Sequence, residues 1–219
     1  MLLDQMTQNH RGESKLMIKN KERKFFRVSP NIRSTSVPGM KLLNKAELLQ
    51  GKGKVLVPEI GQRGFPVYPE MPRFLFGKNL TQATRERVVH DIEKYGAYWL
   101  VSDRLKEIFE RLDPSAFIFV RCEIEMQDKS EPPVYWLCDV VRVLDAIDEV
   151  TSKVQIKHYE DGRKYYSFLG ETSLNFREDI DLSNHIFRLK YAMSAVFCDG
   201  EFKSDFKNFG ITGMDFLAV

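Results

Sequence analysis

The fold is decided by the stretch YWLVSDRLKEIFERL at residues 98–112. Its first four residues are aromatic or apolar, which is typical of a strand. Ser102 follows and is a good N-cap residue, because its hydroxyl can accept a hydrogen bond from an N–H of the first helical turn. The next ten residues carry apolar side chains at helical spacing, and Asp113-Pro114 ends the pattern. The stretch therefore predicts a strand and an amphipathic helix, with a second strand over residues 116–120.

A second copy of this unit lies near the C-terminus. Residues 195–203 read AVFCDGEFK, so Asp199 stands where Ser102 stands in the first copy. Aspartate caps helices as well as serine does. The other signals of this copy are the apolar helix positions Phe202, Phe206 and Phe209, the helix-ending Gly210 and a closing strand from Gly213 to Leu217, which includes Phe216.

The composition indicates a globular protein with one large domain, or one domain with an added arm. The chain has 219 residues, of which 43% are hydrophobic, close to the average for globular proteins. Its 33 basic and 31 acidic residues give a net charge of +2. This balance argues against a dedicated binder of nucleic acids or membrane surfaces, which usually has a strong basic excess.

The sequence also favours a cytoplasmic location. No apolar run approaches the about 18 residues that a membrane span needs, and residues 1–8 lack the apolar region of a signal peptide. Three widely spaced cysteines, with no CxxC pair, indicate buried reduced thiols rather than a disulfide framework. The four histidines are isolated and no HExxH occurs, so we expect no histidine metal site. Our preferred interpretation has no metal, no cofactor and no catalytic residues, and the acidic group described below is the alternative that stays open.

Three regions follow from the local patterns. Residues 1–22 are polar and predict a flexible extension, and residues 23–80 are rich in proline and glycine and predict an irregular arm packed on the main domain. Within this arm, residues 54–57 could form one short strand. Residues 81–219 carry the regular patterns and predict an α+β domain.

Within that domain we expect antiparallel hairpins and a few amphipathic helices. The expected elements are a helix from Thr81 to Gly96, a hairpin of residues 116–125 and 134–143, a helical turn at 144–150, a hairpin of 153–159 and 163–168 around Glu160-Asp161-Gly162, a strand at 186–189, and the two strand–helix–strand units.

An acidic group follows the strand that contains Asp139. If residues 144–150 are helical, Asp145 and Asp148 share one face, with Glu149 beside them. Three interpretations are open: helix capping, an anionic surface that meets a basic groove of a partner, or a site for a divalent metal or acid–base chemistry. A second acidic group, at residues 178–181, is expected to be a solvated turn.

Two aromatic pairs occupy matched strand positions. They are Tyr98-Trp99 and Tyr135-Trp136, and alternation along a strand would send one member of each pair inward and one outward. We expect the tryptophans in the core. The tyrosines would then be available as partner-binding hot spots, together with the acidic residues.

Several of these segments together resemble one bacterial family. They are YWLVSD at 98–103, FIF at 117–119, YWL at 135–137 with DAID at 145–148, IFRL at 186–189, and GITGMDF at 210–216. Their order and spacing resemble immunity-protein family eleven of polymorphic toxin systems, formerly a domain of unknown function, over about residues 24–219. One departure is visible: the second helix usually opens with Ser-Asp, and Asp199-Gly200 stands there in this chain.

The resemblance implies a non-enzymatic cytosolic antidote. Such a protein binds a cognate toxin, usually encoded by an adjacent gene and often delivered by a contact-dependent or type VI-like apparatus, and it protects the producing cell in interbacterial competition. The resemblance also implies that eight residues belong to the family's motifs and have a structural role. They are Trp99, Ser102, Asp103, Trp136, Asp199, Gly210, Gly213 and Phe216. We expect the toxin to be occluded at its active site, with no nucleic acid or membrane as partner.

Two other functions stay open from the residues alone. One is a metal-dependent hydrolase or nuclease that uses the acidic group, although no third ligand is evident. The other is a nucleic-acid binder that uses the basic N-terminal segment, supported only by the aromatic and basic residues KFFR at 24–27.

Overall fold

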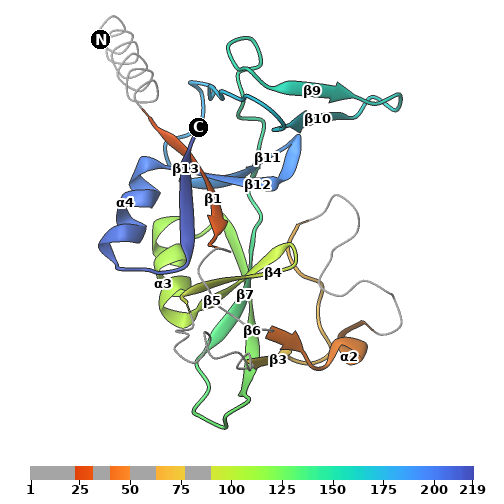
Figure 1. Ribbon diagram of the computed structural model, residues 1–219, viewed down its shortest axis with the longest axis vertical. Helices are drawn as coiled ribbons and strands as arrows, with labels where there is room; N and C mark the ends of the chain where they lie inside the picture. The colour runs from red at the N-terminus through yellow and green to blue at the C-terminus, as the bar shows by residue number, and fades with distance from the viewer. Residues whose placement is uncertain (1–22, 32–39, 50–62, 77–89) are drawn as a thin grey trace, which may run out of the picture.

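The computed structural model describes residues 23–31, 40–49, 63–76 and 90–219 (Figure 1). These residues form thirteen strands and three short helices, so the α+β class is confirmed, with strands predominating. The strands are β1 (Phe25–Pro30), β2 (Met40–Leu42), β3 (Arg73–Phe76), β4 (Ile92–Tyr95), β5 (Tyr98–Ser102), β6 (Phe117–Met126), β7 (Tyr135–Val140), β8 (Val143–Leu144), β9 (Gln155–His158), β10 (Lys164–Ser167), β11 (Ile186–Leu189), β12 (Ala192–Asp199) and β13 (Met214–Ala218). The helices are α2 (Lys45–Leu49), α3 (Asp103–Leu112) and α4 (Gly200–Asn208).

The strands form two larger sheets and one hairpin. Sheet I has the order β13-β1-β12-β11-β8, and sheet II has the order β2-β3-β6-β7-β5-β4. Neighbours pair antiparallel except β8 with β11 and β3 with β6, which are parallel. The remaining pair, β9 and β10, stands at one end of the molecule, opposite the loop that joins β6 to β7 (Figure 1).

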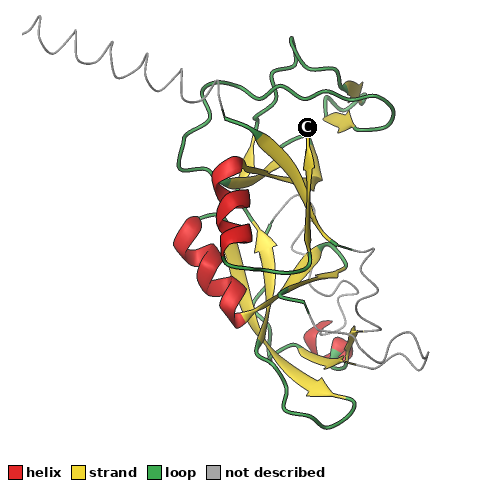
Figure 2. Ribbon diagram, turned by 60° about the vertical axis from the view of Figure 1, so that its left-hand side comes forward, coloured by secondary structure: helices red, strands yellow, loops and turns green. Residues whose placement is uncertain are grey.

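Helices α3 and α4 lie side by side and cover one side of the sheets (Figure 2). Each begins at a side-chain cap: the Ser102 hydroxyl accepts from Leu105 N at 3.2 Å, and Asp199 Oδ1 accepts from Phe202 N at 2.8 Å. The rings of Phe109 and Phe202 pack with centroids 5.6 Å apart. This contact joins the helices of the two strand–helix–strand units in one core.

Sheet II is covered on both faces. The cluster beneath the two helices contains Trp99 and Val101 of β5. A second cluster on the opposite face contains Tyr98 and Leu100 of the same strand, together with side chains of β3 and β6. A third cluster lies between sheet I and the loops of residues 146–180. Strand β5 is therefore buried on both faces.

The helix predicted from Thr81 to Gly96 is wrong over its last part. Ile92–Tyr95 form the strand β4, which pairs antiparallel with β5; residues 81–89 lie outside the described residues. Gly96 has φ +59° in the two-residue turn between the strands. A positive φ at the first central position suits a tight hairpin turn, and a short apolar run cannot by itself distinguish strand from helix.

The helical turn predicted at residues 144–150 is also wrong. Residues 143–144 form β8, and Ile147 makes an isolated bridge with Phe176. Asp148 instead closes a turn, because its carboxylate accepts hydrogen bonds from Val150 N at 2.9 Å and from the Thr151 hydroxyl at 2.8 Å. Aspartate competes with helical hydrogen bonding in this way.

The region expected to be an irregular arm contributes strands to both sheets. β1 lies between β12 and β13 in sheet I, and β2 and β3 extend sheet II beyond β6. The strand suggested at residues 54–57 lies outside the described residues. None of the described helices has the length and hydropathy of a membrane span.

Candidate functional site

An acidic hollow of about 570 Å³ lies on the loops beside the β9–β10 hairpin. Its described lining brings together two acidic groups that are far apart in the sequence, the group at Asp145–Glu149 and the group that includes Glu178 and Asp179. We call this surface the acidic hollow. Its described lining residues are Asp145, Ile147, Asp148, Glu149, Lys164, Arg177, Glu178 and Asp179.

Backbone hydrogen bonds between the two segments position this surface. Asp148 N donates to Asn175 O, and Arg177 N donates to Ala146 O, both at 2.9 Å. The Ile147–Phe176 bridge lies between them. The side chains of Ile147 and Phe176 pack in the core behind the loops, so the acidic residues beside them project to the surface on a fixed backbone.

The charge of the acidic hollow is strongly negative. Five carboxylates face two cations among the described lining residues, which leaves three net negative charges. Lys164 pairs with Glu149, and Arg177 pairs with Asp179 at 2.7 Å. Asp145 is exposed and makes no hydrogen bond or ion pair within the part of the chain that is described.

Hydrogen bonds and ion pairs lower the pKa of three carboxylates of the hollow, those of Asp148, Glu149 and Asp179. The Thr151 hydroxyl and backbone N–H groups lower the pKa of Asp148. Hydrogen bonds from Lys164 and Tyr166 lower the pKa of Glu149, and Arg177 lowers the pKa of Asp179. These hydrogen bonds and ion pairs also fix the side chains, so the negative charge is held in place on the surface.

Three residues predicted to bind a partner lie in the interior instead. Tyr98 and Tyr135 are 3% and 2% exposed, and Asp139 is fully buried. The Tyr135 hydroxyl donates to the backbone oxygen of His90, and burial raises the pKa of both tyrosines, to about 12 for Tyr98. These side chains offer no surface to a partner, and the prediction is corrected for them.

Asp139 is the centre of a buried ionic network that joins the two sheets. Its Oδ1 accepts hydrogen bonds from Arg63 and, at 3.2 Å, from Arg188 Nη2. Its Oδ2 accepts from Gly64 N at 2.8 Å. Arg188 lies on β11 of sheet I and also donates to Val140 O of sheet II at 2.8 Å. The network therefore ties β7 to β11.

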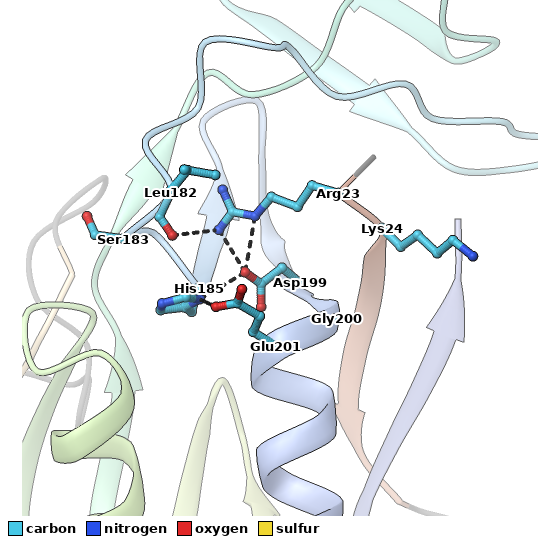
Figure 3. Close-up of a pocket in the computed structure, with 8 residues that line it drawn as sticks. All are labelled: Arg23, Lys24, Leu182, Ser183, His185, Asp199, Gly200 and Glu201. Carbon is cyan, nitrogen blue, oxygen red and sulfur yellow. Dashed lines mark hydrogen bonds and ion pairs between the residues drawn. The ribbon is translucent and has the colours of Figure 1, made fainter. Parts of the chain in front are cut away.

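A second cluster of charged side chains lies at the start of α4, around a pocket of about 550 Å³ (Figure 3). Asp199 Oδ2 accepts from Arg23 Nη2 at 2.8 Å and lies 2.9 Å from His185 Nδ1. Arg23 also donates to the backbone oxygens of Leu182 and Asn184. Hydrogen bonding to Asp199 raises the pKa of His185.

Three side chains of this cluster or beside it have the spacing of metal ligands. Among the described residues, His185, Asp199 and Glu201 are the one group of three whose ligand atoms lie close enough to hold an ion. However, Asp199 Oδ2 already accepts from Arg23 and His185, so an ion would have to displace the guanidinium. The acidic residues Asp145 and Asp148 are not part of any such group.

The comparisons with known proteins agree with the resemblance of the sequence segments. The family model of the Immunity protein family (Imm11) matches residues 24–219, which include every described strand and helix. The chain belongs to the Imm11 immunity protein family. Membership indicates a toxin-neutralising protein and implies a non-enzymatic role. A search of curated proteins found no match.

The residues that carry the sequence resemblance to the family pack and cap the scaffold. Trp99 lies beneath α3, Ser102 and Asp199 cap the two helices, and the Trp136 indole donates to Asp103 Oδ1 at 2.8 Å. The remaining motif residues close the second unit: Gly210 and Gly213 both have positive φ, and Phe216 packs on Phe206 with centroids 5.3 Å apart.

Some residues have positions or ion pairs in the structure that the sequence did not predict. Glu178 and Asp179 are expected in a solvated turn, and the long-range pairing of Ile147 with Phe176, with the backbone hydrogen bonds on either side of it, brings them to the acidic hollow. Arg188 is a lone charge in the apolar strand IFRL, which is a signal for a buried ion pair. Arg63 carries no comparable signal.

Proposed function

We propose that this chain is a cytosolic antidote that binds a cognate toxin and covers the toxin's active site with the acidic hollow. The toxin would be encoded by an adjacent gene and delivered by a type VI-like apparatus. The single observation that carries the proposal is the acidic hollow on a member of an immunity family. Its charge suits a toxin whose active-site groove is basic.

The charge of the hollow would serve association more than stability of the complex. Complementary charge steers two proteins together and fixes their relative orientation, and it disfavours partners of like charge. The ion pairs of Glu149 and Asp179 and the turn at Asp148 hold three of the carboxylates. Side chains that are already fixed lose little conformational entropy on binding.

Apolar contact area would come from the neighbouring loops and the β9–β10 hairpin. Val150 is 95% exposed and directly follows Glu149, and the tyrosines at 159 and 165 are about half exposed on the hairpin. A stable interface buries about 1,600 Å² in total, which is more than the hollow alone. We therefore place the hot spots on these side chains rather than on the buried Tyr98 and Tyr135.

Growth rescue tests the proposal. The C-terminal domain encoded by the adjacent gene is expressed in a sensitive strain, with and without the full chain. We expect toxicity that this chain abolishes, and a complex that co-purifies. Absence of toxicity, or toxicity without rescue, would overturn the antidote function.

A charge reversal then locates the surface. Asp145→Lys changes an exposed carboxylate without a hydrogen-bond partner among the described residues, so the fold should be retained. We expect the association rate for the toxin to fall at least about tenfold at low salt, and less at high salt, because exposed charges are screened. The matched control is Glu131→Lys, which lies in the β6–β7 loop at the other end of the molecule (Figure 1). Equal association rates for both variants would show that the acidic hollow is not part of the interface.

A further inference from the structure

A cavity of about 320 Å³ lies between the two sheets, away from the acidic hollow. Its walls come from β1 and the β11–β12 pair of sheet I and from the β4–β5 turn of sheet II, with Arg63 beside them. We call it the intersheet cavity. Its volume is at the lower end of the range for small-molecule sites in proteins.

Cations line the intersheet cavity. Arg63, Arg188 and Lys94 all face it, and no carboxylate is among its described lining residues. Asp139 lies behind the two guanidinium groups and is the one carboxylate bonded to them among the described residues. One carboxylate therefore faces two arginines, which leaves a surplus of positive charge at the cavity wall.

The two arginines are substantially removed from water. The Arg188 side chain is 4% exposed and that of Arg63 is 17% exposed. The buried Nε of Arg63 has no hydrogen-bond partner in the described structure. A buried donor without an acceptor and a buried charge without a counter-charge are both costly. Burial and the neighbouring Arg63 lower the pKa of Arg188 to about 10, which indicates that the site disfavours its own positive charge.

The other lining residues are mainly apolar or aromatic, with Ser29 and Ser194 among them. Trp99 pairs with Lys94 in the β4–β5 register, and Val28 and Val196 line the cavity from sheet I. Small-molecule sites commonly combine such apolar walls with a few placed polar groups. The shape therefore suits a ligand with one charged end and a small apolar body.

We propose that the intersheet cavity binds a small organic anion. Its carboxylate or phosphate group accepts hydrogen bonds from Arg63 and Arg188, and its apolar body lies against Trp99. Arginine is suited to both groups, because its planar fork of N–H donors matches two oxygens at once. The bound anion supplies the counter-charge that the described lining lacks, and it links the two sheets at a second point beside Asp139.

Trp99 provides a direct reporter. The chain has two tryptophans, so Trp136→Phe leaves Trp99 as the single one in the full-length protein. This variant is titrated with phenyl phosphate, benzoate and, as the neutral analogue, benzamide, at constant ionic strength. We expect a saturable change in Trp99 fluorescence with at least one anion and none with benzamide. The anion that binds more tightly identifies the charged group.

Substitutions at the cations complete the test. In the same background, Arg63→Gln and Lys94→Gln should each weaken anion binding, by at least about tenfold for Arg63→Gln, because charge-assisted hydrogen bonds are lost. Arg163→Gln is the matched control, since its side chain is 74% exposed on the distant hairpin, and it should leave binding unchanged. If Arg63→Gln fails to fold, Lys94→Gln decides alone.

The proposal is overturned if neither anion changes the fluorescence, if benzamide gives the same response, or if Arg63→Gln and Lys94→Gln bind as the parent does. Rescue from the toxin is measured separately and does not depend on this cavity. Failure here would therefore leave the antidote function standing.

Discussion

Replacing Asp139 by asparagine should destabilise the fold more than any exposed charge change. The carboxylate is fully buried and accepts hydrogen bonds from two arginines and from Gly64 N. Asparagine keeps the shape but removes the charge, so Arg63 and Arg188 would share no counter-charge among the described residues. Breaking a buried ion pair from one side costs about 3–5 kcal/mol. For a chain of this size that corresponds to a fall in Tm of roughly 6–20 °C.

The assay is guanidinium and thermal unfolding at pH 7, followed by far-UV circular dichroism. Asp161→Asn is the matched control, because the Asp161–Arg163 pair is exposed on the β9–β10 hairpin, with side chains 52% and 74% exposed. We expect no measurable change for the control. A loss for Asp139→Asn below about 1 kcal/mol, the level of an exposed pair, would refute the conclusion that this network ties the sheets together.

Three further predictions concern the scaffold. The pKa of Asp199 lies below its ordinary 3.8 and that of His185 above its ordinary 6.5, because they are hydrogen-bonded to each other. Asp199 therefore loses its contribution as pH falls through its folded pKa, and His185 loses its contribution as pH rises through its own. The stability difference between the wild type and His185→Gln should be larger at about pH 5.5 than at about pH 8.5. Gly213→Ala should cost about 1–3 kcal/mol in chemical unfolding, because φ is +94° and a Cβ would lie 2.6 Å from a backbone oxygen. Gly162→Ala, with nothing within 4 Å, should cost less. Phe202→Ala should cost about 3–5 kcal/mol in the same assay, since the ring is 1% exposed.

Local signals predicted the two helices that cover the sheets. Ser102 and Asp199 accept the hydrogen bonds expected of N-cap residues, and the apolar faces of both helices are buried. Phe209 is the exception, because it is the C-cap of α4 and is 39% exposed, with Arg111 over its ring. Caps and helical spacing depend on residues a few positions apart, so a sequence carries them directly.

Long-range pairing limited the other predictions. The apolar side chains on both faces of β5 are buried, because α3 covers one face and the cluster with side chains of β3 and β6 covers the other. Because both faces of such a strand are covered, the rule that alternate residues face solvent does not apply to it. The rule predicts Tyr98 at the surface, whereas this side chain is 3% exposed. The same holds for Tyr135 and Asp139 on β7. A sequence gives the period of a strand but not the number of layers around it.

The acidic hollow and the helical scaffold are built from different residues of the chain. Its carboxylates lie on loops, whereas Ser102 and Asp199 cap the two helices. The two are joined through Phe176, which pairs with Ile147 behind the hollow and stacks on Phe25 of β1 with centroids 4.3 Å apart. The loops are thus held by the core of sheet I, and the buried Tyr166 of that core donates a hydrogen bond to Glu149, whereas Asp145 is exposed. We therefore expect Asp145→Lys to leave the fold intact, so that under the proposed antidote function its effect would be on toxin binding alone.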